Sequence, residues 1–319
     1  MEPVTRLGGR LLAVWPLVLL TLAACAGTPQ SDRLLSAGTT AGGLPMRAQI
    51  TDVPFFAQEE RYCGPASLAM VLVWGGIATD QEEVGEEIYT PGREGTLVSD
   101  VLGGARRHGR LAVPVNTLDA LLAEIAAGHP VIVFQNLGLD WYQQWHFAVA
   151  IGYDLDAGTL TLHSGLDERR VTPLDTFEHT WRRGDYWALV VLPPATLPAT
   201  GSEGEVVDAA VAIERLGLTG DAAQAYAAIV ERWPGSGTAW LGLGNTAYAM
   251  GDLFDAADAF GRAAVADPDF GAAWNNLAVV LAEQGHRNAA IDAAEKAIAT
   301  GNGDIEEYRR TLEEVGAGT

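Results

Sequence analysis

The chain has 319 residues, of which 48% are hydrophobic and 19% charged, and its formal net charge is −21. This length exceeds what one hydrophobic core usually organises, so we expect two domains in a folded, not a disordered, protein. A chain this acidic is not expected to bind nucleic acid, because binding to the phosphates requires a basic protein surface. The one lysine, Lys296, follows no glycine-rich loop, which excludes a P-loop nucleotide site.

The N-terminus has the pattern of an export signal. Two arginines precede an apolar stretch, Leu11 to Leu22, which is too short to span a membrane. The stretch ends in Leu22-Ala23-Ala24-Cys25, which resembles a bacterial lipobox. Residues 1–24 are therefore predicted to be a lipoprotein signal peptide, and the resemblance implies that a lipid on Cys25 anchors the protein to a membrane. The alternative is an ordinary signal peptide that contains a cysteine.

The residues after Cys25 bear on location and on how the chain leaves the membrane. Ala26 stands where, in enteric bacteria, an aspartate would retain a lipoprotein in the inner membrane, so the resemblance favours the outer membrane, facing the periplasm. Residues 25–48 are rich in glycine, serine, threonine and alanine, a composition that predicts a flexible tether.

Residues 49–194 mix strand and helix signals, which predicts an α+β domain. Cys63–Trp74 is apolar at helical spacing, with Pro65 in its first turn. Further helices are expected at 80–89 and 117–127, and strands at 50–54, 131–134, 147–153, 159–163 and 186–192. Residues 195–202 follow two prolines and are predicted to be a linker.

Residues 203–319 carry an internal repeat of 34 residues. Five positions recur at this spacing: Trp240, Leu243, Gly251, Ala256 and Ala263 match Trp274, Leu277, Gly285, Ala290 and Ala297. The period and pattern resemble tetratricopeptide repeats, which are helix pairs stacked into an all-α solenoid that binds other proteins. The resemblance implies three repeats, at 203–236, 237–270 and 271–304, and a capping helix from Asp304 to Val315.

Acidic residues outnumber basic residues by 19 to 7 from Gly201 onward. An array this acidic favours basic or neutral partner segments over anionic lipid. The alternative interpretation is a solvated surface that keeps the protein soluble.

Cys63 stands where a helix is predicted to begin, and a helix N-terminus lowers the pKa of a thiol. Gly64 would leave room for a substrate carbonyl. Gln58, on the incoming loop, is placed to donate a hydrogen bond to the oxyanion of a tetrahedral intermediate, together with the Cys63 N–H. These features indicate a nucleophilic cysteine, and the alternative is a buried, inert one.

A nucleophilic cysteine needs a base. Of the six histidines, His146 is the best candidate because it opens an apolar strand, next to Trp145, which would shield the pair from water. His108 and His129 lie in turns, and His286 lies in the repeats.

Three blocks together resemble family-39 cysteine peptidases, papain-fold enzymes best known for removing double-glycine leaders from bacteriocins. The blocks are Gln-x4-Cys-Gly-Pro-Ala at 58–66, Gly-x-Pro-Val-Ile at 128–132, and His-Phe-Ala-Val-x-x-Gly-Tyr-Asp at 146–154. The resemblance covers residues 50–192 and implies that 49–194 form a papain-like cysteine peptidase domain. It makes Cys63 the nucleophile, His146 the base and Gln58 the oxyanion donor.

The family orients its histidine with an Asp or Asn at the end of the strand after the hairpin, and this chain departs from that pattern. Pairing Tyr153 with Thr159 across the hairpin puts Ser164 opposite Ala148, on the face of His146. Ser164 is therefore the expected orienting residue. Its neutral hydroxyl stabilises an imidazolium less than a carboxylate does.

Three functions fit these features. The first is a membrane-anchored cell-envelope cysteine peptidase that cleaves a peptide or protein substrate recruited by the repeats. The second is an assembly lipoprotein whose peptidase fold only binds, which Ser164 favours unless Asp154 or Asp167 takes over its role. The third is transglutamination or related chemistry on the same cysteine and histidine. We expect no metal and no cofactor, because no metal-binding motif is present.

Overall fold

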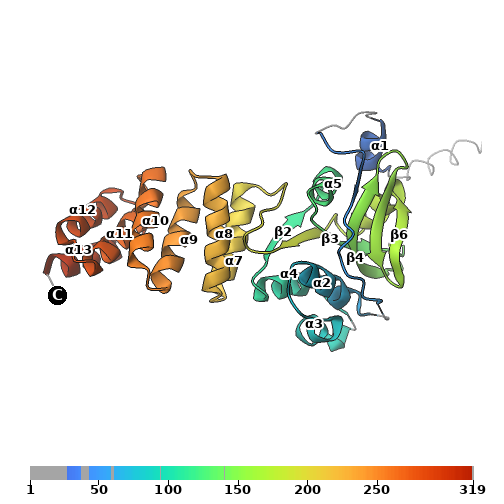
Figure 1. Ribbon diagram of the computed structural model, residues 1–319, viewed down its shortest axis with the longest axis horizontal. Coiled ribbons are helices and arrows are strands. Elements are labelled where there is room, and N and C mark those ends of the chain that lie inside the picture. The colour runs from blue at the N-terminus through green and yellow to red at the C-terminus, as the bar shows by residue number, and fades with distance from the viewer. Residues whose placement is uncertain (1–26, 37–42, 59–60, 94, 140, 318–319) are drawn as a thin grey trace, which may run out of the picture.

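The computed structural model describes residues 27–36, 43–58, 61–93, 95–139 and 141–317. An α+β domain is followed by an array of helices that extends away from the sheet (Figure 1). The predicted fold class, an α+β domain followed by an all-α array, is confirmed. The predicted signal peptide and Cys25 lie outside the described residues.

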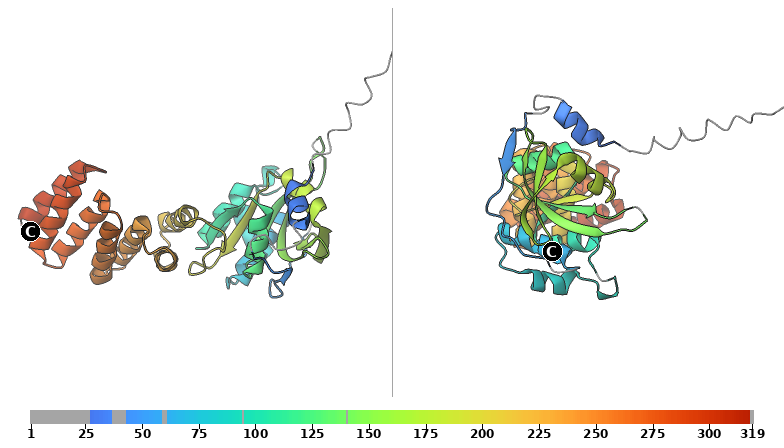
Figure 2. Two further views of the ribbon diagram at one scale, coloured as in Figure 1. Left: turned by 90° about the horizontal axis from the view of Figure 1, so that it is seen from above. Right: turned by 90° about the vertical axis from the view of Figure 1, so that its right-hand side faces the viewer.

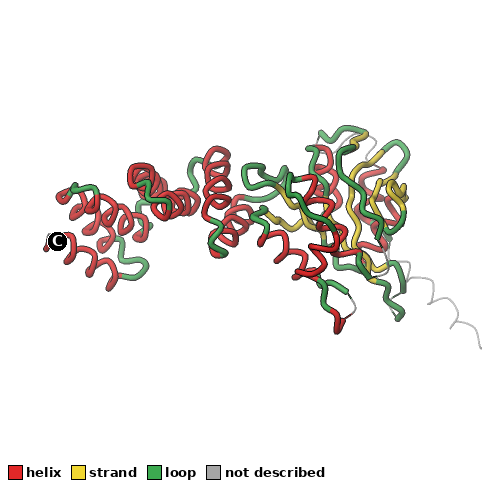
Figure 3. The backbone as a smooth tube through the Cα atoms, turned by 60° about the horizontal axis from the view of Figure 1, so that its bottom comes forward, coloured by secondary structure: helices red, strands yellow, loops and turns green. Residues whose placement is uncertain are grey.

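The α+β domain contains, in chain order, α1 (Pro29–Ser36), β1 (Arg47–Gln49), α2 (Cys63–Trp74), α3 (Gln81–Ile88), the 3-10 turn η1 (Pro91–Arg93), α4 (Val98–Arg107), β2 (Leu111–Val115), α5 (Leu118–Ala126), β3 (Val131–Asn136), β4 (Trp145–Asp154), β5 (Thr159–Ser164), β6 (Asp167–Pro173), α6 (Leu174–Arg182) and β7 (Ala188–Leu192). The array contains α7 (Glu203–Arg215), α8 (Thr219–Arg232), α9 (Gly237–Ala249), α10 (Leu253–Ala266), α11 (Gly271–Glu283), α12 (Arg287–Ala299) and α13 (Ile305–Ala317). Figure 3 separates the mixed half from the helical half by colour.

The strands form one antiparallel sheet in the order β2-β7-β3-β4-β5-β6, and β1 pairs with the far end of β4. β4 lies inside this sheet and is buried along its middle residues. Helix α2 packs against β4 and helix α6 against β3. Large side chains such as Leu68, Phe147 and Trp181 fill the space between helices and sheet. Burying one such side chain contributes about 1.5–3 kcal/mol.

The stretch predicted as a flexible tether contains an ordered helix, α1, which lies against the α+β domain (Figure 2). The buried carboxylate of Glu178 accepts hydrogen bonds from the N–H of Gln30 at 3.1 Å and from the N–H and Oγ of Ser31 at 2.7 and 2.6 Å. These N–H groups belong to the first helical turn, which has no intrahelical acceptors. The tether prediction is therefore wrong for this segment, because an acid far along the chain caps the helix.

The first strand also differs from the prediction. It occupies residues 47–49 and not 50–54, although the N–H of Ile50 still bonds to the carbonyl of Ile151 at 2.7 Å. Four elements between 98 and 182 were not predicted, namely α4, β2, β6 and α6. β6 is exposed and charged over most of its length, so it lacks the alternation that marks a strand.

The helices of the array pair as the 34-residue period predicts. Each pair lies within one of the three predicted repeats, and α13 follows as the predicted cap. Ala222, Ala256 and Ala290 are fully buried, which allows the helices to cross closely. The indoles of Trp240 and Trp274 each donate to the carbonyl of a proline six residues earlier, at 2.9 and 3.0 Å. These contacts explain why a tryptophan stands near the start of the second and third repeats.

The predicted linker, residues 195–202, is held to the α+β domain by Glu124. This fully buried carboxylate accepts hydrogen bonds from the N–H of Ala199 at 3.0 Å and from the N–H and Oγ of Thr200 at 2.7 Å, and it lies 2.7 Å from Nδ1 of His129. Burial opposes ionisation of Glu124, but these hydrogen bonds outweigh it and lower the pKa of the carboxyl.

The hydrophobic core also crosses the junction. Helix α7 packs against β2, and one continuous cluster of buried residues runs from the sheet through α7 and α8 to Ala239. Beside it, Nη1 of Arg232 donates to the carbonyl of Pro198 at 2.6 Å. The first repeat is therefore packed on the domain through a shared core.

Replacing Glu124 with glutamine is expected to lower the free energy of unfolding by about 2–3 kcal/mol at pH 7. The neutral amide loses the charge-assisted hydrogen bonds, and its NH₂ group would face the N–H and O–H donors that now bind the carboxylate. The pKa of Glu124 is lowered from 4.5, so its contribution is present above pH 4.5 and is lost as the pH falls further. Denaturant unfolding measures the difference. Glu231→Gln, on the exposed face of α8, is the control, and equal losses in both variants would contradict this role.

Candidate active site

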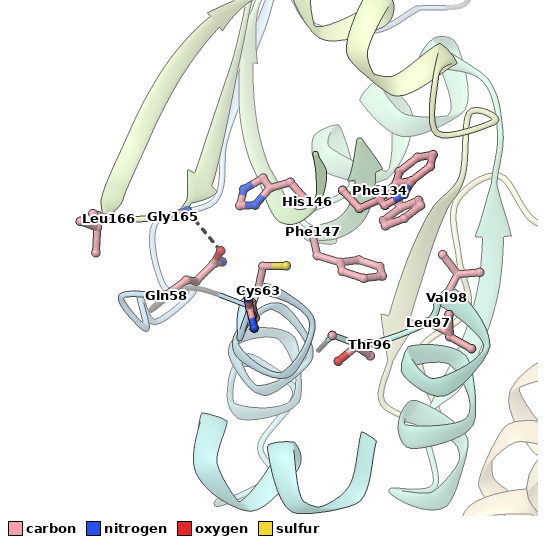
Figure 4. A pocket seen from close by; sticks show the side chains of 13 residues that line it. Gln58, Cys63, Thr96, Leu97, Val98, Phe134, His146, Phe147, Gly165 and Leu166 are labelled. Atoms are coloured by element: carbon pink, nitrogen blue, oxygen red, sulfur yellow. Dashed lines mark hydrogen bonds between the residues drawn. The ribbon is translucent and has the colours of Figure 1, made fainter. Parts of the chain in front are cut away.

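A cleft of about 1080 Å³ lies at the N-terminal end of α2. Gln58, Cys63 and His146 line it, and Figure 4 shows their side chains gathered in one region. They come from the loop before α2, the first turn of α2 and the start of β4. The structure thus brings together three of the predicted site residues, which are up to 88 positions apart in the sequence.

Cys63 is the first residue of α2, as predicted. Pro65 has no N–H, so the remaining donors of the first turn, the N–H groups of Cys63 and Gly64, are directed at the thiol. Burial raises the pKa of the Cys63 thiol, while these two N–H groups and that of Phe147 act in the opposite direction. The helix start therefore provides donors for a thiolate, but burial keeps the thiol protonated at rest.

The side chain of Thr96 fills the space beside Gly64. The sequence analysis expected this space to be open for a substrate carbonyl, and that expectation is wrong. A Cβ added to Gly64 would lie 2.6 Å from the Cβ of Thr96, closer than two carbons approach. Glycine is therefore needed for the Thr96 loop to pack on α2. The buried Oγ1 of Thr96 has no partner among the described residues and lies in the wall of the cleft.

His146 is held by Ser164. Its Nε2 lies 2.9 Å from the Ser164 Oγ, and with the proton on Nε2 the other nitrogen, Nδ1, carries the lone pair that a general base uses. Burial lowers the pKa of His146 to about 4, and the positive charge of Arg170 adds to this shift. His146 is therefore neutral, and able to accept a proton, above about pH 4. Among the described residues no hydrogen bond joins it to Cys63.

Ser164 reaches this position through a β-bulge. The hairpin pairs Tyr153 with Leu160, one residue away from the predicted partner, and Ile151 is then left without a partner on β5. Beyond the bulge Val149 faces His163, a register that places Ser164 beside Ala148. The predicted position of Ser164 is right although the predicted pairing at the hairpin is wrong.

Gln58 is fixed by Gly165, the residue after Ser164, which the sequence analysis did not single out. The N–H of Gly165 donates to Oε1 of Gln58 at 3.2 Å (Figure 4). The N–H of Gln58 donates to the carbonyl of Gly165 at 3.0 Å. Because Oε1 of Gln58 accepts the hydrogen bond from Gly165, Nε2 is the remaining polar atom of the side chain. Nε2 is buried and has no partner among the described residues. An unsatisfied buried donor costs about 1–3 kcal/mol, so a ligand oxygen at this point would be favoured.

The other wall of the cleft is apolar. Leu97 and Val98 line it at the start of α4, and Trp145 stacks on Phe134 with ring centroids 5.0 Å apart. Trp145 itself is 46% exposed and lies at the border of the cleft. It therefore does not shield the Cys63–His146 pair from water as the sequence analysis expected.

His163 has a different role from His146. It is buried on the other face of β5, with Nε2 3.2 Å from the carbonyl of Val53 and Nδ1 against the carbonyl of Glu168. It supports the loop that leads to Gln58. In the part of the chain that the structure describes, no group of three His, Cys, Asp or Glu side chains is arranged to hold a metal ion, and no helix is long and apolar enough to cross a bilayer.

Comparison with known families agrees with this architecture. Residues 50–188 match the model of the Peptidase_C39 like family, and residues 207–253 and 241–305 match that of the tetratricopeptide repeat. The chain therefore consists of a C39-like peptidase domain followed by tetratricopeptide repeats, which confirms both resemblances. A search of curated proteins gave no significant match.

The solved structures that match this chain each align to one of its two domains. A protein described as a C39-like peptidase, from Bacillus anthracis, is 21% identical with a TM-score of 0.40, over 46% of this chain and 97% of that one. A double glycine motif protease from an AMS/PCAT transporter, in complex with the leader peptide, is 23% identical with a TM-score of 0.35, over 45% and 93%. The Sgt2 repeat domain from Aspergillus fumigatus is 23% identical with a TM-score of 0.35, over 37% and 79%.

Replacing Ser164 with aspartate is expected to raise the pKa of His146 from about 4 by at least about one unit, because an adjacent carboxylate favours the imidazolium. The folded protein resists protonation of His146, so the wild type loses stability as the pH falls from 6.5 to about 4, and the variant should lose less. An NMR titration of the imidazole measures the shift. Thr159→Asp, at the other end of β5, should leave it unchanged, and an equal shift in both would rule out the orienting role.

Proposed function

We propose that this protein is a cysteine peptidase of the cell envelope, anchored by a lipid on Cys25, that cleaves peptide or protein substrates. The observation that carries the proposal is the Nε2 of Gln58, which has no partner among the described residues and lies in the same cleft as the helix-start thiol of Cys63 and the His146–Ser164 pair. A site that only binds apolar segments has no need of a buried amide donor beside a thiol.

The reaction follows from these positions. The Cys63 sulfur attacks the scissile carbonyl carbon while Nδ1 of His146 takes the thiol proton, because both groups are neutral at rest. The oxyanion accepts hydrogen bonds from Nε2 of Gln58 and the N–H of Cys63, each worth about 3–4 kcal/mol. His146 then protonates the leaving amine, and a thioester remains. Water, deprotonated by His146, cleaves the thioester and restores the thiol.

The repeats supply protein binding in this proposal. Tetratricopeptide repeats serve protein–protein interaction in general. Because they are packed on the domain through α7 and Glu124, a segment bound to them is kept near the peptidase domain. We assign them the recruitment of the substrate or of a partner that delivers it.

Hydrolysis of a fluorogenic peptide library by the full chain, purified in detergent, tests the peptidase. Cys63→Ala should abolish hydrolysis. Gln58→Ala should lower kcat by about 10²–10³ with little change in KM, because its donor acts on the transition state. Gln224→Ala, on the exposed surface of α8, should have no effect. Hydrolysis that persists without Cys63 would overturn the assignment of the nucleophile.

A second candidate is a catalytically inactive module that only binds. Two observations favour it: the orienting residue is a neutral serine, and burial shifts the pKa of Cys63 up and that of His146 down, away from an ion pair. Alkylation by iodoacetamide distinguishes the two. In an enzyme, His146 takes the thiol proton as the sulfur attacks the reagent, so Cys63 should react more slowly in His146→Ala than in the wild type, whereas in a binding module both proteins should react alike.

Membrane anchoring is tested separately. In a bacterial host that processes lipoproteins, the full chain should incorporate labelled fatty acid, enter the detergent phase on phase separation and fractionate with the outer membrane. Cys25→Ser should lose all three properties, since acyl chains supply the anchoring energy at about 0.8 kcal/mol per buried CH₂. Cys63→Ser should keep them, and labelling of Cys25→Ser would place the lipid elsewhere.

A further inference from the structure

A second cleft, of about 480 Å³, lies where α4 of the peptidase domain meets α7 of the first repeat. It shares no lining residue with the cleft around Cys63. Gly103, Arg106 and Arg107 face it at helical spacing from α4, and Asp208 and Arg215 face it from α7. Each domain therefore supplies one wall.

Positive charge dominates this cleft. The guanidinium groups of Arg106, Arg107 and Arg215 oppose one carboxylate, that of Asp208. Among the described residues Arg106 and Arg215 form no ion pair, and Nε of Arg107 lies 3.7 Å from Glu87, a carboxylate that also contacts His108. The chain as a whole has 41 acidic residues and 20 basic ones. The excess of positive charge in this cleft therefore has the opposite sign to the net charge of the protein.

Arg106 supplies an independent indication of a ligand. Its Nε is buried and has no hydrogen-bond partner in the part of the chain that the structure describes. A buried guanidinium N–H without an acceptor is unfavourable, and like charges facing one cleft repel. The planar donors of arginine match the oxygens of a phosphate or carboxylate, and the negative charge of such a ligand would offset the repulsion between the guanidinium groups.

The walls of the cleft are held in place without a ligand. Glu124 fixes the linker that leads into α7, and α7 packs on β2. The remaining lining is apolar, from Val211, Ala212 and Leu216. A preformed site of this kind loses little entropy on binding, and it suits a small anion with a short apolar body.

We infer that the cleft between α4 and α7 is a binding site for a small oxyanion, a phosphoryl or carboxylate group held by Arg106, Arg107 and Arg215. This site goes beyond the proposed peptidase activity and does not depend on it. Its ligand would bind both domains across their junction, and binding would stabilise the folded chain by mass action.

Thermal unfolding of the full chain tests the site, with inorganic phosphate and with succinate as probes against sodium chloride at equal pH and ionic strength. The melting temperature should rise saturably with at least one probe. A response to phosphate alone identifies a phosphoryl site, and a response to succinate alone a carboxylate site. No rise beyond that in sodium chloride overturns the inference.

Variants locate the effect. Arg106→Gln and Arg215→Gln should each weaken the probe that binds by at least about fivefold, since each removes a charge-assisted contact. Arg215 is exposed, so its variant carries the test even if Arg106→Gln does not fold. Arg309→Gln, which removes an exposed ion pair with Glu306 on α13, should bind as the wild type does. Unchanged affinity in both cleft variants overturns the inference.

Discussion

The pairing of β4 with β5 sets the positions of the polar groups in the cleft around Cys63. It places the Ser164 hydroxyl 2.9 Å from His146, and the next residue, Gly165, fixes the amide of Gln58. The bulge at Ile151 brings β5 into this register and turns the Ile151 carbonyl toward β1, where it accepts hydrogen bonds from Ile50 and Gln49. A local irregularity in one strand thus sets the positions of His146, Ser164 and Gln58 together.

Burial decides the resting protonation of the site. It raises the pKa of Cys63 and lowers that of His146, so both favour their neutral forms at physiological pH. Two neutral groups avoid the desolvation of an ion pair in an apolar cleft. Under the proposed mechanism, the donors around Cys63 would act on charge only when it develops during attack, which is when stabilisation accelerates a reaction.

Local sequence signals predicted the elements that carry the site. Pro65 and the two glycines after Trp74 mark the ends of α2, and the structure has the same bounds as the prediction. The 34-residue period predicted the helix pairs, because each repeat packs only on its neighbours. What could not be predicted depends on distant contacts: Glu178 orders α1, and Thr96 fills the space at Gly64. Neither contact has a sequence pattern of its own.

The junction between the two domains brings the first repeat close to the sheet. The buried carboxylate of Glu124 and the shared core hold α7 and α8 against the peptidase domain. Under the proposed function, a polypeptide bound to the first repeat would have to span the distance from there to Cys63, so only a chain of sufficient length would reach the thiol. The solenoid would then select substrates by length. The number of residues between the bound segment and the susceptible bond would determine which substrates are cut, together with the residues at that bond.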